Sequence, residues 1–156
     1  MSTRAPLLFI IRGLPGSGKT TRAFALGEEI DTGAASADDY FTDEDGIYRF
    51  DPRDLPAAHA ECQDKVRKYL LHERDVIVHN TFTQGWEATP YVIMAEKFGA
   101  EIKVIDLFDG GLDDAALAAR NVHGVPLASI AAMRGRWEAD LLAAQAAEPR
   151  APWERG

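Results

Sequence analysis

A glycine-rich segment carries the strongest chemical signal in the chain, the sequence GLPGSGKT at residues 13–20. It fits the spacing G-x-x-x-x-G-K-[ST], in which glycines let backbone N–H groups surround a polyphosphate without obstruction by Cβ atoms. Lys19 would bring a positive charge to the β- and γ-phosphates, and the Thr20 hydroxyl would bind Mg²⁺. The segment therefore predicts a nucleotide polyphosphate site. Its residues are Gly13, Gly16, Ser17, Gly18, Lys19, Thr20 and Thr21.

Two adjacent carboxylates, Asp38 and Asp39, follow a short segment over Gly33–Ala37 that we interpret as an additional strand. Adjacent residues of an extended segment point to opposite sides, so we expect at most one carboxylate to face the γ-phosphate. A carboxylate there can accept the proton of a substrate hydroxyl as the hydroxyl attacks phosphorus. The candidate base at this point is therefore either Asp38 or Asp39. The alternative is that both residues belong to a solvated acidic loop.

Polar residues follow the second predicted strand, in the sequence VIVHNTFTQGW at residues 76–86. No acidic residue ends this strand, so Mg²⁺ would be held by Thr20, phosphate oxygens and water, assisted by Asp38. The polar cluster either binds the acceptor or caps the loop and the next helix. Phe82 and Trp86 either stack on a base or pack in the core. The candidate acceptor-binding residues are Asp39, His79, Asn80, Thr81 and Trp86.

The segment LAARNVHGVP at residues 117–126 supplies an arginine after the third predicted strand. Arg120 can act as a lid arginine that neutralises charge on the transferring phosphoryl group. Arg134 and Arg136 on the predicted last helix are weaker candidates, because an exposed helical arginine is usually only solvated. His123 precedes a glycine and is interpreted as a turn residue.

Alternating strand and helix patterns must position these residues. Short apolar runs predict buried strands, and stripes of apolar residues three or four apart predict helices. The order of these elements predicts an α/β fold of three layers, with a parallel sheet flanked by helices on both faces and ligands at the carboxyl ends of its strands. The predicted strands are 7–11, 76–78 and 101–107, and the predicted helices are 19–29, 55–74, 86–98 and 126–147.

The composition suits one folded domain. The chain has 156 residues, of which 46% are hydrophobic, enough for a buried core. We predict a domain over residues 1–148 and a loose C-terminal tail over 149–156. A single cysteine, Cys62, cannot form an internal disulfide, and no apolar run is long enough to cross a membrane. We expect a soluble, intracellular protein, either a monomer or a weak oligomer.

The net charge of −8 is concentrated in one part of the chain. Residues 28–54 hold ten acidic residues against two arginines, whereas the remainder carries equal numbers of acids and bases. Overall acidity therefore does not exclude DNA as a substrate. It predicts weak, salt-sensitive non-specific binding, with recognition confined to the pocket.

Taken together, these motifs resemble the polynucleotide-kinase-like P-loop kinases (AAA_33-type). The resemblance implies dependence on ATP and Mg²⁺ and transfer of the γ-phosphate to a hydroxyl. It also implies that Lys19 and Thr20 bind phosphate and metal, that Asp38 is the general base and that Arg120 is a lid arginine. The motifs are GLPGSGKT, ADDYF, Tyr48-Arg49-Phe50, Ala58-His59, Cys62, VIVHNTFTQGWE, Pro90-Tyr91, RNVHGVP, Met133 and Arg136-Trp137-Glu138.

Departures from the family pattern concern the acceptor. Polynucleotide 5′-kinases have an arginine shortly after the DDY motif, where this chain has Phe41 and Thr42, and His79 replaces an aspartate before NT. The chain is similar to the phage branch, whose kinases act on 5-hydroxymethyluracil in DNA, which would place it in the host cytoplasm. We expect that acceptor. The alternatives are a 5′-hydroxyl end, a small molecule, or a non-catalytic nucleotide-binding regulator.

Overall fold

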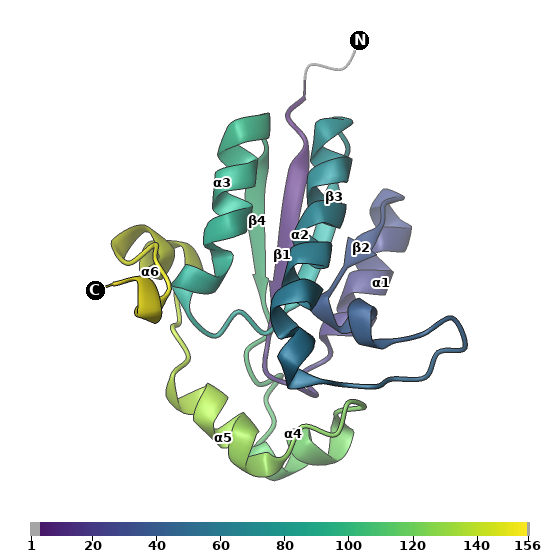
Figure 1. The fold of residues 1–156 in the computed structure, drawn as a ribbon, viewed down its shortest axis with the longest axis vertical. Coiled ribbons are helices and arrows are strands. Elements are labelled where there is room, and N and C mark those ends of the chain that lie inside the picture. Colours follow the sequence, from purple (N-terminus) through teal and green to yellow (C-terminus); the bar gives the residue numbers. More distant parts are fainter. Residues whose placement is uncertain (1–3, 156) are drawn as a thin grey trace.

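The computed structural model of the chain describes residues 4–155. Its centre is a four-stranded parallel sheet with the order β2-β3-β1-β4 (Figure 1). The strands are β1 (Leu7–Arg12), β2 (Ala34–Ala35), β3 (Val76–Asn80) and β4 (Glu101–Asp106). The α-helices are α1 (Lys19–Ile30), α2 (Leu55–Leu71), α3 (Thr89–Phe98), α4 (Asp114–Arg120), α5 (Leu127–Gly135) and α6 (Leu141–Ala147). Short 3-10 helices are η1 (Ala37–Phe41), η2 (Pro52–Asp54), η3 (Gly85–Ala88) and η4 (Pro152–Glu154).

Helices lie on both faces of the sheet because successive residues of its strands point to opposite sides. One face is covered by α2 and α3 (Figure 1). Leu8 and Ile10 of β1 are buried in one apolar cluster with side chains of these two helices. On the other face, Ala23 and Leu26 of α1 pack against Ile11. The prediction of a three-layer α/β fold with a parallel sheet is confirmed.

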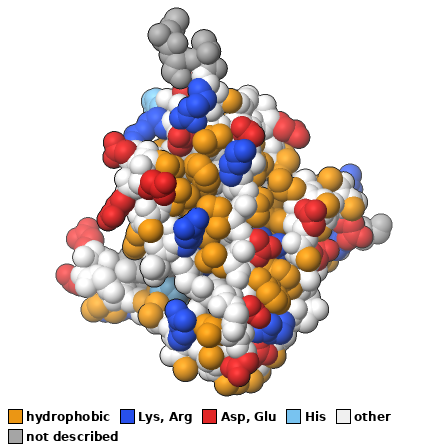
Figure 2. All heavy atoms as spheres, turned by 180° about the vertical axis from the view of Figure 1, so that it is seen from behind, with side chains coloured by type: hydrophobic (Ala, Val, Ile, Leu, Met, Phe, Trp, Pro, Cys, Tyr) orange, Lys and Arg blue, Asp and Glu red, His pale blue; other side chains and the backbone are white. Residues whose placement is uncertain are grey.

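The face that α1 covers is not completely closed. Phe9 and Ile105 pack against the apolar cluster of α1 but remain partly accessible. Figure 2, seen from that side, shows hydrophobic side chains interspersed with charged ones. No helix within residues 4–155 is long and apolar enough to cross a membrane.

The predicted strands are found, with different ends. The strand predicted at 76–78 continues through His79 to Asn80, so both polar residues belong to β3 itself. Only Ala34 and Ala35 of the predicted segment Gly33–Ala37 form a strand, at the edge of the sheet. The extra length of β3 is set by its pairing with β1, where Arg12 lies opposite Asn80.

The predicted last helix over 126–147 is wrong, because the chain forms two helices there, α5 and α6. Asp140 caps the start of α6 with its side chain. Between the two helices, the Trp137 ring lies 3.9 Å from the Arg12 guanidinium. The Glu138 carboxylate accepts a hydrogen bond of 2.8 Å from a backbone N–H of η3. These tertiary contacts outweigh the helical pattern and interrupt the helix.

Other helix ends also differ from the predictions. The helix predicted to reach Arg74 stops at Leu71, and Glu73 takes a left-handed conformation with φ of 57°. The helix predicted from Trp86 begins as η3, and the α-helix proper starts at Thr89 with a proline in its first turn. The short helix α4 was not predicted.

The C-terminal residues differ from the loose tail expected after residue 148. Residues 152–154 form η4, and Ala151 is buried. The ring of Trp153 packs edge-on against Trp86, with ring centroids 5.1 Å apart. Figure 1 shows this end of the chain beside α6.

The fully buried side chain of Arg12, at the end of β1, ties together the chain segments around it. Its Nη2 and Nε atoms donate to the Phe82 carbonyl at 2.7 and 3.0 Å. Its Nη1 atom donates to the Asp106 carboxylate at 3.0 Å and to the Ala139 carbonyl at 3.4 Å. Burial lowers the pKa of Arg12, and Asp106 opposes that shift. The guanidinium thus links the ends of β1, β3 and β4 to the connection between α5 and α6.

We predict that Arg12→Met lowers the free energy of unfolding by about 3 kcal/mol, because it leaves buried carbonyls and the Asp106 carboxylate without their donor. Urea denaturation monitored by circular dichroism measures the change. Arg22→Met is the matched control, since Arg22 is exposed on α1 and its loss should change stability by less than about 0.5 kcal/mol. Equal stability of the two variants would contradict the role assigned to Arg12.

Candidate functional site

A cavity of about 530 Å³ lies at the carboxyl ends of the strands, where ligands bind in open parallel sheets. Its walls come from the glycine-rich loop, η1, residues 48–59, the end of β3 and the connection between α4 and α5. The structure brings together most of the residues predicted for the site. Those that line the cavity are Gly16, Gly18, Lys19, Thr20, Thr21, Asp38, His79, Asn80, Thr81 and Arg120. The predicted residues outside its lining are Gly13, Ser17, Asp39 and Trp86.

The glycine-rich loop has the backbone conformations that its sequence predicts. Gly16 and Gly18 have φ of 83° and 103°, in the left-handed region that favours glycine. A Cβ atom on Gly16 would lie 2.4 Å from the Leu117 carbonyl oxygen, so this glycine lets α4 pack against the loop. The Ser17 hydroxyl is buried without a hydrogen-bond partner among the described residues, and a Cβ atom on Gly13 would lie 2.3 Å from it. A side chain at position 13 would therefore collide with Ser17, so these two residues support the loop conformation without lining the cavity.

Lys19 is the cation of this loop. Its Nζ atom donates a hydrogen bond of 3.2 Å to the Leu14 carbonyl. Burial lowers the pKa of Lys19 to about 8, and the Asp38 carboxylate opposes the shift. A buried ammonium group at the start of α1 gains most from a bound anion, because the helix N-terminus favours negative charge as well. The residues present therefore fit a polyphosphate.

Fewer protein atoms are available to bind Mg²⁺ than to bind the phosphates. Thr20 is exposed in the first turn of α1 and lines the cavity. Within residues 4–155, no group of three or more His, Cys, Asp or Glu residues could hold a metal ion. The end of β3 carries His79, whose pKa is lowered chiefly by burial. A hydroxyl and a carboxylate in a cavity that suits phosphate are compatible with Mg²⁺, which keeps several waters and phosphate oxygens as ligands.

Asp38 lies in η1 with both carboxylate oxygens engaged. The Tyr48 hydroxyl donates to Oδ1 at 3.2 Å, and Nε2 of His123 lies 3.5 Å from Oδ2. The rings of Tyr48 and His123 are in contact, with centroids 4.1 Å apart. Burial raises the pKa of Tyr48, with a further contribution from Asp38, so this hydroxyl stays a donor. His123, interpreted from the sequence as a turn residue, thus faces the proposed base.

Asp39 and Asn80 hold η1 in place. The Asp39 carboxylate accepts from the Ser36 N–H at 3.1 Å and closes a capping box at the start of η1. The Asn80 side-chain oxygen accepts from the Ala37 N–H at 2.9 Å and ties this turn to the end of β3. These side chains therefore position Asp38. Asp38 lines the cavity and Asp39 does not, but both lie in the 3-10 helix η1, so the extended segment assumed from the sequence at these two residues is wrong.

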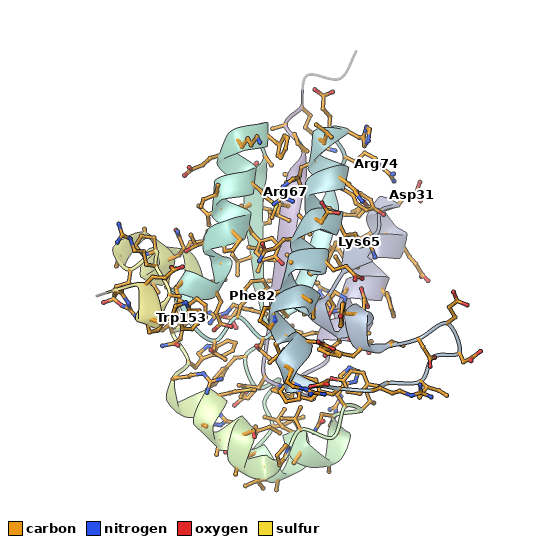
Figure 3. All side chains as sticks on the ribbon, viewed as in Figure 1. Asp31, Lys65, Arg67, Arg74, Phe82 and Trp153 are labelled. Carbon is orange, nitrogen blue, oxygen red and sulfur yellow. The ribbon has the colours of Figure 1, made fainter. Side chains whose placement is uncertain are left out.

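The second half of the motif after β3 faces away from the cavity. Phe82, labelled in Figure 3, is buried in the core. Its ring lies edge-on to that of Tyr91. The Thr83 hydroxyl donates to the Glu87 carboxylate at 2.6 Å. Trp86 packs against Trp153, which lies beside α6 (Figure 3), and does not line the cavity. The stacking of a base on Phe82 or Trp86 is therefore not supported.

Arg120 is the arginine that remains available at the cavity. It ends α4 and is exposed, and its side chain makes no hydrogen bond or ion pair with the described part of the chain. Arg134 forms ion pairs of 2.8 Å with both Asp109 and Asp114. The Nε atom of Arg136 donates to the Thr83 hydroxyl at 3.2 Å. Arg134 and Arg136, the two weaker candidates, thus make contacts that stabilise the fold.

Sequence reasoning missed the side chains around Asp38. Tyr48 and His123 are separated from Asp38 by 10 and 85 positions in the chain. The motif YRF around Tyr48 was part of the family resemblance, which was the only available signal for it. Nothing in the local sequence at His123 indicates a contact with Asp38.

Residues 8–139 match the model of the AAA_33 family, described as an AAA domain. The chain belongs to this family. This AAA_33 domain is 35% identical over 131 residues to NEDD4-binding protein 2 of Homo sapiens. The matched region covers 81% of this chain and 7% of that protein. It therefore corresponds to a small part of that relative.

Solved structures share the fold of this AAA_33 domain. The Pnkp1/Rnl/Hen1 RNA repair complex matches with a TM-score of 0.70 and 19% identity, over 94% of this chain and 47% of that one. A proposed kinase from Chloroflexus aurantiacus matches with a TM-score of 0.64 and 19% identity, over 87% and 79% of the two chains. A gluconokinase from Sinorhizobium meliloti matches with a TM-score of 0.52 and 16% identity, over 86% and 77%.

We predict that ATP binding takes up a proton above about pH 8, because phosphates stabilise the charged form of Lys19 and raise its lowered pKa. The contribution of Lys19 to ATP affinity should be constant below that pH and fall by up to about tenfold per pH unit above it. Calorimetric titrations in buffers of different ionisation enthalpy measure both quantities. Lys19→Met should bind more weakly and show no such pH dependence. Proton uptake that persists in this variant would assign the effect to another group.

Proposed function

We propose that this AAA_33 domain is a kinase that transfers the γ-phosphate of ATP to a hydroxyl group. The observation that carries the proposal is that one cavity contains both Lys19 of the phosphate loop and the Asp38 carboxylate. A phosphate donor and a proton acceptor are the two parts that phosphoryl transfer to a hydroxyl needs. The fold shared with a gluconokinase and a proposed kinase supports this reaction class.

In the proposed reaction, the acceptor oxygen forms a bond to the γ-phosphorus while the bond from that phosphorus to the β–γ bridging oxygen breaks. The acceptor proton passes to Asp38, and ADP leaves. Lys19 and the N-terminus of α1 stabilise charge on the phosphates, and Arg120 neutralises charge on the transferred group. Thr20 and Asp38 are the residues that would hold Mg²⁺, which supplies further charge neutralisation when bound.

We further propose DNA as the substrate, with the hydroxymethyl group of 5-hydroxymethyluracil as the acceptor in a phage DNA modification reaction. The support comes from the positions where a 5′-kinase would place its arginine. Phe41 is buried against the rings of Tyr48 and Phe50. The Thr42 hydroxyl donates to the backbone carbonyl of Asp38 at 3.2 Å. Neither residue is free to bind a terminal phosphate, which favours an acceptor within the strand.

Labelled ATP offered with a panel of acceptors tests the proposal. The panel contains DNA with 5-hydroxymethyluracil, 5′-hydroxyl oligonucleotides, RNA, free nucleosides and gluconate. Label recovered on internal nucleotides after nuclease digestion of the strand supports the proposed acceptor, and label confined to the 5′-terminal nucleotide identifies a 5′-kinase instead. Label on a small molecule alone would make the chain a small-molecule kinase. ATP binding without any labelled acceptor would favour a nucleotide-binding regulator and overturn the kinase.

We predict that Asp38→Asn lowers the rate of transfer by about 10²-fold or more, because the amide cannot accept the acceptor proton. ATP affinity, measured by calorimetry, should remain close to that of the wild type. Asp39→Asn is the matched control, since the neighbouring carboxylate caps η1 and an amide oxygen can replace it. A loss of the same size in Asp39→Asn would remove the distinction between the two residues.

A further inference from the structure

Aromatic side chains form part of the cavity wall beside Asp38. Tyr48 and Phe50, which we call the aromatic shelf, both line the cavity. Their rings are nearly parallel, with an angle of 12° between planes and centroids 6.4 Å apart. Phe41 lies behind both rings at centroid distances of 6.2 and 5.0 Å and is buried. The shelf is therefore supported from within the protein.

Phe50 is half exposed although it lies in a cavity. Its exposed fraction is 51%, and the neighbouring cavity residue Leu55 is also exposed. Apolar surface in a concave site is stabilised when a ligand removes it from water. An aromatic ring offers a flat face for stacking, which each nucleobase can match. The shelf thus favours a planar, uncharged group.

The surrounding charge disfavours a phosphate next to the shelf. The lysine and arginine side chains among the described residues that line the cavity are Lys19 and Arg120. Lys19 belongs to the phosphate loop, and Arg120 ends α4, whose Leu117 carbonyl lies against Gly16 of that loop. The segment that carries the shelf is acidic instead, with Asp43, Glu44 and Asp45 exposed between η1 and Tyr48. Of its arginines, Arg53 is paired with Asp51 at 2.8 Å. Arg49, between the two shelf residues, is exposed but does not line the cavity.

The shelf is also connected to the proposed base. The Tyr48 hydroxyl donates to Asp38 at 3.2 Å. Tyr48 therefore contributes its ring to the shelf and its hydroxyl to a hydrogen bond with the proposed proton acceptor. A ring stacked on Phe50 would therefore present its substituents close to Asp38. A hydroxyl carried on a short substituent of such a ring suits this arrangement.

We propose that the aromatic shelf binds the acceptor as an unpaired nucleobase, stacked on Phe50, with its sugar and phosphates directed away from the acidic segment. The inference rests on the proposed kinase function and names how that function selects its acceptor. A base within a duplex is covered on both faces by its neighbours, so it must leave the stack before it can occupy the shelf. A free nucleoside and a base in a single strand share the required chemistry.

Steady-state kinetics with Phe50→Leu test the stacking. The acceptors are 5-hydroxymethyl-2′-deoxyuridine and the same base in a single-stranded oligonucleotide and in a duplex. Phe50→Leu should raise the acceptor KM about tenfold, because the stacked ring is lost, and leave the KM for ATP unchanged. Phe50→Tyr, which keeps the ring, should behave like the wild type. Trp153→Leu, at an exposed aromatic residue outside the cavity lining, should also do so.

The outcomes separate the possible acceptors. If the nucleoside and the single strand are phosphorylated with similar KM values, the base alone is the ligand. If the KM for the strand is much lower, the strand makes further contacts outside the cavity. Either result supports the shelf if Phe50→Leu weakens both. Unchanged acceptor KM in Phe50→Leu would overturn it. Equal use of the duplex and the single strand would overturn the requirement for an unpaired base.

Binding measurements separate this inference from the proposed reaction. Calorimetry with the nucleoside and ADP, on the wild type and on Phe50→Leu, reports binding without turnover. If no acceptor is phosphorylated but the nucleoside binds and Phe50→Leu weakens it about tenfold, the kinase proposal fails and the shelf stands. If transfer occurs but nucleoside binding does not depend on Phe50, the shelf fails and the kinase stands.

Discussion

The buried guanidinium of Arg12 is the interaction on which the site most depends. A buried charge is costly unless hydrogen bonds and an opposite charge compensate it. Here carbonyls from the end of β3 and the α5–α6 connection accept its hydrogen bonds, and Asp106 of β4 provides the countercharge. Each of these segments must reach one point in the interior. Because Arg12 directly precedes Gly13, that point is also where the phosphate loop begins.

This constraint explains why residues far apart in the sequence meet around one cavity. Gly13 and Leu14 continue from Arg12 and bond to the backbone of Thr81 and Phe108, which follow β3 and β4. Gly16 lets α4 approach the loop, and α4 carries Arg120 to the cavity. The phosphate loop, the end of β3 and the arginine are therefore positioned by the same packing. A catalytic site gains from such rigid support because its groups need fixed distances.

The phosphate loop and the places of the strands along the chain were predictable because each depends on local sequence. Three glycines, a lysine and a threonine at this spacing are typical of a phosphate-binding loop. Buried parallel strands consist of continuous apolar runs, which are visible in the sequence. The last helix was not predictable in the same way. Its apolar spacing continues from α5 into α6, but Trp137 and Glu138 gain more from contacts with Arg12 and η3 than from a continuous helix. Trp86 likewise packs on Trp153 instead of joining the acceptor residues.

The sequence by itself determined the three-layer α/β fold and predicted a phosphate-binding loop, because both follow from local residue types and spacing, and the family resemblance indicated Asp38 as the candidate base. Only the tertiary structure decided what surrounds that base. Tyr48 and His123 reach Asp38 from separate segments, and Arg134 is paired with Asp109 and Asp114. The reason is physical: a side chain's partners depend on how distant elements pack, and a linear pattern does not record that distance.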